Sequence, residues 1–236
     1  MKIDVIGNGC TWTKELSTSY IINDEILFDV PQGSFKTLFK KYNLDKINYI
    51  IISHFHSDHF GDLHIVLDYI FNCRPDAKPT IIAPAGCKEK ICAMFRLFEI
   101  SYFEEYLKER VNFITLENLS KFKLDKYKLK SFKMTHANID SYGIIIEENG
   151  VKVGFSGDTS MCNNVRKILK KSQACFIDSA NIDKNNKHLS VSEVNELEKE
   201  FTECKVYRIH LSDLAINELN KNRIYYPKQG ETIEIN

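Results

Sequence analysis

The stretch Ser53-His54-Phe55-His56-Ser57-Asp58-His59-Phe60-Gly61-Asp62 decides the fold, because it places four metal-coordinating side chains within six consecutive positions. Residues 47–53 lead directly to His54 and form a continuous apolar and β-branched run, which is typical of a strand buried on both faces. Since alternate residues of a strand face the same way, His54 and His56 could hold one ion together. A tight turn after the strand would aim Asp58 and His59 at a second ion beside it.

Neutral imidazole and carboxylate groups are ligands suited to zinc, and to manganese or iron where more oxygen ligands join. A polar loop with histidines placed by chance is the alternative interpretation. The His-x-His-x-Asp-His spacing directly after a buried run favours the metal site.

Four further polar side chains stand at the ends of predicted elements, where a rigid scaffold can hold metal geometry. His136 follows a predicted strand at 131–135, Asp158 follows one at 151–155, and His210 ends one at 205–210. His188 precedes a predicted helix at 191–201, for which Ser190 or Ser192 would be a natural N-cap. These positions extend the candidate metal site beyond the first stretch.

Composition excludes several classes of protein. The chain has 236 residues, 32 Lys and Arg, 32 Asp and Glu, and a formal net charge of zero, so a protein that coats nucleic acid generally is disfavoured. The length and the lack of a linker predict one domain over residues 1–236. The apolar runs are too short to span a membrane, no secretory signal is evident, and the 7 cysteines form no Cys-x-x-Cys pair. These features predict a cytoplasmic protein with free thiols.

The remaining pattern predicts strands in two blocks, each accompanied by helices, and therefore sheets covered by helices on their outer faces. The clearest hairpin joins residues 142–147 to 151–156 around an Asn149-Gly150 turn. In residues 121–134 the apolar alternation changes parity twice, which predicts a turn near Asp125 and a β-bulge near Ser131. Further strands are expected at 2–6, 19–22, 26–30, 80–83, 174–178 and 231–235, and helices at 33–42, 63–71, 87–98, 102–110 and 163–171.

Taken together, these residues resemble the metallo-β-lactamase superfamily over nearly the whole chain. The resemblance implies an αββα sandwich: two mixed β-sheets packed face to face, with helices on both outer faces. It also implies a binuclear site, with two divalent ions, Zn²⁺ first and Mn²⁺ or Fe²⁺ as alternatives. The implied ligands are His54, His56 and His136 for the first ion, Asp58, His59 and His210 for the second, and Asp158 between both.

Within this superfamily the chain resembles the ribonuclease Z-like branch of phosphodiesterases. The segment His188-Leu189-Ser190 is similar to the helix opening where that branch carries an extra catalytic histidine, and Phe28-Asp29-Val30-Pro31-Gln32-Gly33 is similar to its approach to the metal loop. The Pro-Gly-His-Thr pattern of the glyoxalase and β-lactamase branches is missing after His136. The chain also lacks the long Gly/Pro-rich arm with which bacterial ribonuclease Z clamps transfer RNA.

The resemblance therefore implies a hydrolase of a small-molecule or nucleic-acid phosphodiester, and it is compatible with a homodimer. A lactone or sulfate-ester hydrolase with the same metals, and a non-catalytic binding relative, are the alternatives. In the implied mechanism two metals lower the pKa of a bridging water towards 7 and supply a hydroxide nucleophile. Asp58 would orient it and accept its proton, and a protonated His188 would protonate the leaving oxygen.

Residues 121–133 carry six lysines, which is the feature of the sequence that best fits nucleic acid, since clustered cations can contact successive phosphates. The alternative is a solvated sheet edge, where lysines discourage pairing with another chain. The sequence alone favours the sheet edge, because no aromatic stacking residues alternate with the lysines at exposed positions.

Overall fold

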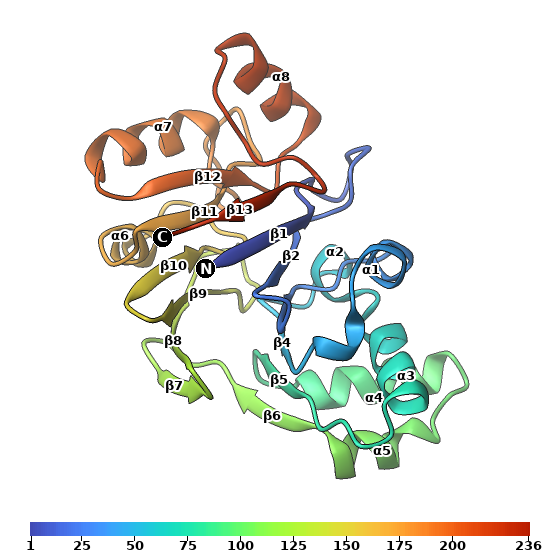
Figure 1. The fold of residues 1–236 in the computed structure, drawn as a ribbon. Helices are drawn as coiled ribbons and strands as arrows, with labels where there is room; N and C mark the ends of the chain where they lie inside the picture. The colour runs from blue at the N-terminus through green and yellow to red at the C-terminus, as the bar shows by residue number, and fades with distance from the viewer.

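Two β-sheets face each other in the computed structural model, which describes all residues from 1 to 236. Figure 1 shows helices α1 to α5 covering the outer side of one sheet and α6 and α7 lying on the outer side of the other, with α8 beyond α7. The larger sheet has 7 strands in the order β13-β1-β2-β3-β4-β5-β6, and the smaller has 6 in the order β12-β11-β10-β9-β8-β7. Both sheets mix parallel and antiparallel pairs, so the predicted αββα sandwich is confirmed.

The larger sheet consists of β1 Lys2–Gly7, β2 Ser19–Ile22, β3 Ile26–Phe28, β4 Tyr49–Ile51, β5 Thr80–Ala83, β6 Asn112–Thr115 and β13 Thr232–Glu234. The smaller sheet consists of β7 Lys121–Leu124, β8 Tyr127–Lys133, β9 Tyr142–Glu148, β10 Val151–Phe155, β11 Ala174–Asp178 and β12 Lys205–Ile209. The helices are α1 Phe35–Lys41, α2 Ser57–Phe60, α3 Leu63–Cys73, α4 Cys87–Leu97, α5 Phe103–Arg110, α6 Asn163–Leu169, α7 Val191–Glu200 and α8 Asp213–Lys221, with a 3₁₀ turn at Leu44–Lys46. None of these helices is long and apolar enough to cross a membrane.

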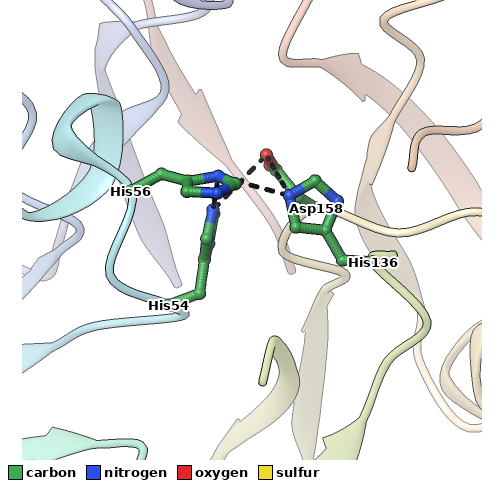
Figure 2. Close-up of side chains that lie close together, drawn as sticks. All are labelled: His54, His56, His136 and Asp158. Atoms are coloured by element: carbon green, nitrogen blue, oxygen red, sulfur yellow. Dashed lines mark hydrogen bonds and ion pairs between the residues drawn. The ribbon is translucent and has the colours of Figure 1, made fainter. Parts of the chain in front are cut away.

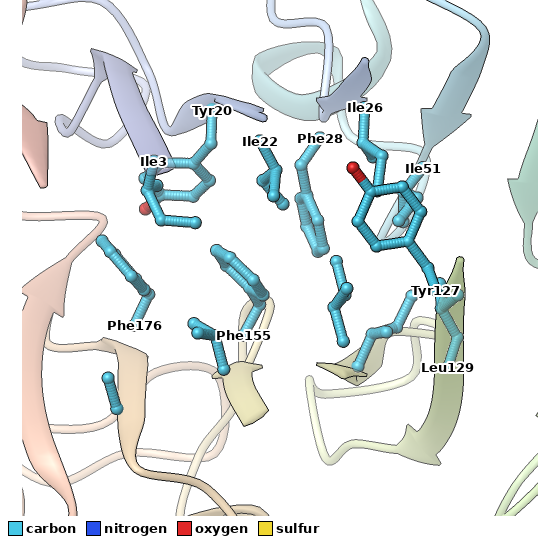
Figure 3. Close-up of a cluster of buried hydrophobic side chains, with 14 of the residues drawn as sticks. Ile3, Tyr20, Ile22, Ile26, Phe28, Ile51, Tyr127, Leu129, Phe155 and Phe176 are labelled. Carbon is cyan, nitrogen blue, oxygen red and sulfur yellow. The ribbon is translucent and has the colours of Figure 1, made fainter. Parts of the chain in front are cut away.

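An aromatic-rich core lies between the sheets (Figure 3). Phe155 stacks on Phe176 with ring centroids 5.1 Å apart and on Phe28 with centroids 4.9 Å apart, and Tyr20 packs against Phe155 and Phe176. Because strand residues alternate between faces, the other face of each sheet is free to bury a second set of side chains under the helices. Leu27 and Ile50 do so beneath the α1–α5 layer. This double burial explains the continuous apolar runs of the sequence.

Strand β8 corrects one prediction, because its pairing with β9 runs without interruption from Lys128 to Lys133 and contains no bulge near Ser131. The predicted parity change has another cause. Leu129 and Ser131 face the inner core side, while Phe132 on the opposite face is buried under α6. One half of the outer face of β8 is thus covered and the other half, around Lys128 and Lys130, is not.

Other predicted elements are found with small changes in length. The turn at Asp125 joins β7 to β8, and the Asn149-Gly150 turn joins β9 to β10 with positive φ at both residues. Strand β6 and helix α8 were not predicted. Both lie at the periphery, β6 as the half-exposed edge of the larger sheet and α8 packed against α7.

Candidate metal centre

The predicted ligands meet where several strands end at one edge of the sandwich. His54 and His56 follow β4, Asp158 follows β10, and His210 follows β12, so the carboxyl ends of strands from both sheets converge there. The prediction that His54 and His56 face the same way as alternate residues of a strand was wrong. Strand β4 ends at Ile51, and both histidines lie in the loop beyond it. Their rings converge through the loop path rather than through strand alternation.

The one-turn helix α2 supplies the predicted tight turn and carries Asp58 and His59. Both side chains are buried, at 5% and 1% exposure. His136 lies beyond the end of β8, where it forms an isolated bridge with Ile139. His210 adopts a left-handed backbone with φ of 56°, a conformation that turns the chain sharply after β12.

A first group comprises the three imidazoles of His54, His56 and His136 with the carboxylate of Asp158 (Figure 2). His56 Nδ1 lies 3.0 Å from His54 Nε2 and 3.3 Å from His136 Nε2. Asp158 Oδ2 lies 3.7 Å from His54 Nε2 and 3.9 Å from His136 Nε2. Three ring nitrogens and one oxygen therefore point at a common centre.

A second group comprises Asp58, His59 and His210. His210 Nε2 lies 3.4 Å from Asp58 Oδ2, and His59 Nε2 lies 3.8 Å from the same oxygen. Asp158 borders this group too, since its Oδ1 lies 3.3 Å from His59 Nε2 and its Oδ2 lies 3.3 Å from His210 Nε2. Asp158 is the side chain that faces both groups.

Besides the spacing of the side chains, an unpaired ring nitrogen indicates that these residues fit divalent ions. His59 Nε2 is buried and has no hydrogen-bond partner, although its other ring nitrogen, Nδ1, is paired with Asp29. Buried polar atoms in proteins nearly always have a partner, so an orphaned imidazole nitrogen that faces carboxylates fits a ligand whose partner is an ion. Imidazole nitrogens 3.0–3.3 Å apart fit the same interpretation.

The charges within the cluster compensate one another. Burial and the neighbouring His59 hold the pKa of His54 well below its usual value, so this imidazole is neutral and able to coordinate. Burial acts against protonation of His59, but Asp158 and Asp29 outweigh it and raise the pKa of His59 well above normal. Burial likewise opposes ionisation of Asp158, yet His210 and His59 keep the pKa of its carboxyl low. Metal binding would replace the proton of His59, because a ligand nitrogen must be unprotonated.

Asp29 fixes the orientation of His59 and was not predicted as a site residue. Its carboxylate accepts hydrogen bonds from the backbone N–H of Ser53 at 2.7 Å and from Ser53 Oγ at 2.8 Å. Its Oδ2 also lies 2.7 Å from His59 Nδ1. The backbone of Asp29 is left-handed, with φ of 56°, directly after β3. The segment from Phe28 to Gly33 resembles ribonuclease Z, but the sequence assigned Asp29 itself no role.

Replacing Asp29 by asparagine should weaken metal binding by roughly 10–100-fold, because partners that orient a ligating histidine typically contribute that much. Asparagine tolerates the left-handed backbone but removes the charge that faces His59 Nδ1. Competition with a chromophoric chelator measures the Zn²⁺ affinity. Asp24→Asn, in the turn of the same hairpin where Asp24 pairs with Lys2, is the matched control. Equal affinities in the two variants would show that Asp29 does not support the ligand.

His188 lies beside the cluster, two residues before the Ser190 N-cap of α7. Its ring centroid is 4.9 Å from that of His136 and 4.9 Å from that of His210. Its Nδ1 lies 2.9 Å from Asp178 Oδ2. Burial alone would lower the pKa of His188, but Asp178 reverses this and raises it to about 9.

Asp178, the last residue of β11, also escaped the sequence analysis. Asp158, Asp178, His188 and His210 lie close enough to hold an ion themselves. The Asp178 carboxylate already accepts hydrogen bonds from the backbone N–H groups of Thr159 at 2.9 Å and Ala180 at 3.1 Å, besides its contact with His188. A carboxylate so occupied fits the positioning of His188 better than coordination.

A cavity of about 590 Å³ opens above the cluster. Its wall includes His56, Asp58, His136, Asp158, His188 and His210 from the site, together with residues of the loop after β1 such as Thr11 and the largely exposed Trp12. Thr11 Oγ1 donates a hydrogen bond of 2.6 Å to Asp58 Oδ2, a contact that the sequence did not reveal. This volume suits a small ligand or one terminal group of a larger one.

Solved structures share this architecture. The metallo-β-lactamase fold protein YhfI from Bacillus subtilis is 16% identical, with 98% of each chain covered and a TM-score of 0.78. The short form of human tRNase Z is 19% identical, with both chains fully covered and a TM-score of 0.77. Among curated proteins, ribonuclease Z from Staphylococcus haemolyticus is 29% identical over 144 residues, covering 57% of this chain and 45% of that protein. The chain spans about half the length of the curated relatives it matches.

Fold and metal-ligand cluster together define a metallo-β-lactamase fold protein similar to ribonuclease Z, as the sequence predicted. Within that class the chain belongs to the family described as Anti-Pycsar protein Apyc1, which matches residues 1–232. The sequence predicted the superfamily and the ribonuclease Z-like branch but not this narrower family.

Proposed function

We propose that the chain is a binuclear metal-dependent hydrolase that cleaves a phosphodiester. The observation that carries the proposal is that the Asp158 carboxylate borders both groups of ligands. Its oxygens lie 3.3 Å from His59 Nε2 and His210 Nε2, and 3.7 Å from His54 Nε2. In the proposed site His54, His56 and His136 hold one ion, Asp58, His59 and His210 hold the other, and Asp158 contacts both. Nitrogen and oxygen ligands of this kind favour Zn²⁺, with Mn²⁺ or Fe²⁺ as alternatives.

Bound metal ions supply an activated water at neutral pH and polarise the phosphoryl oxygen. The side chains of this chain do the remaining work. Asp58 orients the attacking water and accepts its proton, and Thr11 fixes the rotamer of Asp58 through its 2.6 Å hydrogen bond. His188, held by Asp178 through Nδ1, presents Nε2 to the leaving oxygen and protonates it.

The geometry also favours a compact substrate over transfer RNA. The segment between the metal loop and His136 forms α3, α4, α5 and strands β5 to β8, all of which belong to the sandwich. It therefore leaves no separate clamping arm. A cavity of about 590 Å³ admits a small phosphodiester or the terminal nucleotides of a strand.

Protein loaded with Zn²⁺ or Mn²⁺ should hydrolyse the chromogenic substrate bis(p-nitrophenyl) phosphate, and chelation should abolish this activity reversibly. Cyclic nucleotides and RNA ends are then compared as natural phosphodiesters, with p-nitrophenyl sulfate and a lactone assayed in parallel. Metal content is measured in the same sample. Protein that holds two ions per chain but cleaves only the sulfate or the lactone would refute the phosphodiesterase proposal and support the alternative hydrolase. Protein that holds both ions and cleaves none of them would favour a binding role.

A further inference from the structure

A second cavity, of about 850 Å³, lies on the outer face of the smaller sheet and contains none of the candidate metal ligands. It is bounded by β7 and β8 on one side and by the end of α6 on the other, all on the left of Figure 1. We call it the lysine groove. Its wall contains seven lysines and one acidic residue: Lys121, Lys123, Lys128, Lys130, Lys152, Lys170, Lys171 and Glu147. The chain as a whole is electrically neutral, so this concentration of positive charge is local.

Strand register aligns these lysines in opposing pairs. Lys121 lies directly across from Lys130, and Lys123 lies directly across from Lys128, in the antiparallel pair β7–β8. Like charges directly opposite each other on an antiparallel pair are destabilising. Two consecutive repulsive pairs on one face of a hairpin therefore cost stability, and a bound anion would offset that cost.

Compensation from within the chain is small. Glu147 pairs with Lys128 at 3.0 Å and lies 3.9 Å from Lys152, so one carboxylate is shared by two lysines. Lys121 and Lys130 form no ion pair in the structure. The pKa of Lys130 is lowered, first by partial burial and then by the charges of Lys121, Lys171 and Lys167, which indicates that these ammonium groups face a common space.

Protection of the sheet edge does not account for this arrangement. Strand β7 is the edge of the smaller sheet, and lysines on it can discourage pairing with another chain. Lys128, Lys130 and Lys152, however, stand on the interior strands β8 and β10, and the turn that follows α6 supplies Lys170 and Lys171. Lysines near a helix C-terminus are common, but these two line the same cavity as the strand lysines.

The side chains that the lysine groove lacks limit the class of ligand that it can bind. Ile145 and Leu129 are buried, and Phe122, the one aromatic residue of the wall, is half-buried and packs against the core between the sheets. No fully exposed aromatic or large apolar side chain lines the cavity. Base stacking and insertion into a lipid surface both need such side chains. A concave wall of flexible ammonium groups can instead follow the phosphates of a single strand, independently of its sequence. We propose that the lysine groove binds single-stranded nucleic acid through its phosphates, at a site separate from the metal cavity.

The groove lies away from the metal centre along the same strand. From Lys130 and Lys128, three to five further residues lead to the end of β8 at Lys133, a path of roughly 10–17 Å at about 3.3 Å per residue, and His136 follows three residues later. A single-stranded nucleic acid bound in the lysine groove would be held near the metal cavity without filling it. The binding site and the proposed catalytic site can thus be tested independently.

Fluorescence anisotropy with a labelled oligothymidylate of about 15 nucleotides tests the proposal on the full-length, metal-loaded protein. Phosphorothioate linkages in the probe resist cleavage. The triple variant Lys121→Gln/Lys130→Gln/Lys171→Gln should weaken binding at least tenfold, since three phosphate contacts are lost. The slope of log Kd against log salt should fall by about 2, at about 0.7 per phosphate for a single strand.

Matched controls separate the groove from general charge. Lys36→Gln/Lys40→Gln/Lys41→Gln removes the same charge from exposed positions of α1 and should leave Kd within about twofold. Arginine at the three groove positions should retain binding. Turnover of bis(p-nitrophenyl) phosphate should be the same in all variants, so a missing catalytic activity would not affect the binding result. Equal losses in both glutamine triples, or groove-dependent binding to phosphatidylserine vesicles without binding of the oligonucleotide, would overturn the proposal.

Discussion

Replacing Asp158 by alanine should eliminate both metal ions and reduce hydrolysis to the level of chelator-treated protein. Its two carboxylate oxygens lie 3.3 Å from His59 Nε2 and His210 Nε2 and 3.7 Å from His54 Nε2, so no other side chain borders both ligand groups as closely. Loss of a partner that merely orients a ligand costs about 10–100-fold in affinity. Loss of the ligand shared by both groups should cost more than that upper value.

Metal-to-protein ratios measured after gel filtration test this expectation. Asp158→Asn preserves the volume of the side chain and removes its charge, so it serves where the alanine variant is too unstable to purify. Asp140→Ala is the matched control, because Asp140 is exposed and pairs with Lys133 outside the cluster. If Asp158→Ala still retains two ions per chain after gel filtration, Asp158 does not join the two groups and the proposed site is wrong.

The position of the loop that carries His54, His56, Asp58 and His59 was predictable because its signals are local. Residues 50–53 are buried, as the apolar pattern predicted, whereas Asn48 is exposed and Tyr49 is half-buried. The polar side chains of the loop follow within eight residues of Ile51. The Asn149-Gly150 turn was predictable for the same reason, since its positive φ values restrict the residues that can occupy it. Such features depend on neighbours in the sequence and need no knowledge of tertiary packing.

The residues that support the ligands could not be found in this way. Asp29 contacts His59 across 30 positions, and Thr11 contacts Asp58 across 47. Each is one polar residue without a spacing rule, and its role arises only when distant strand ends meet. The error at Ser131 has a related cause, because burial of Phe132 depends on α6, which lies more than thirty residues later. Periodicity reports the burial of a residue but not which element covers it.

His188→Ala should reduce hydrolysis of a phosphodiester with a poor alkoxide leaving group by about 10²–10⁴-fold, the usual contribution of a positioned general acid. The loss on bis(p-nitrophenyl) phosphate should be smaller but still at least about tenfold, because a nitrophenolate needs less help from a proton. Metal content should be unchanged, since Nδ1 of His188 is held by Asp178 at 2.9 Å. A loss that depends on the leaving group is expected of an acid and not of a structural residue.

The pH dependence provides a second, independent readout for His188. Its pKa of about 9 means that the side chain is protonated at neutral pH and loses its proton as pH rises through that value. Activity that requires the acid should therefore fall on the alkaline side, at or below about pH 9, since nearby metal ions would lower the pKa. This decline should vanish in His188→Ala and persist in His64→Ala, where a half-buried histidine stacked on Phe98 outside the site is removed. Full turnover of the poor substrate by His188→Ala would show that another group protonates the leaving oxygen.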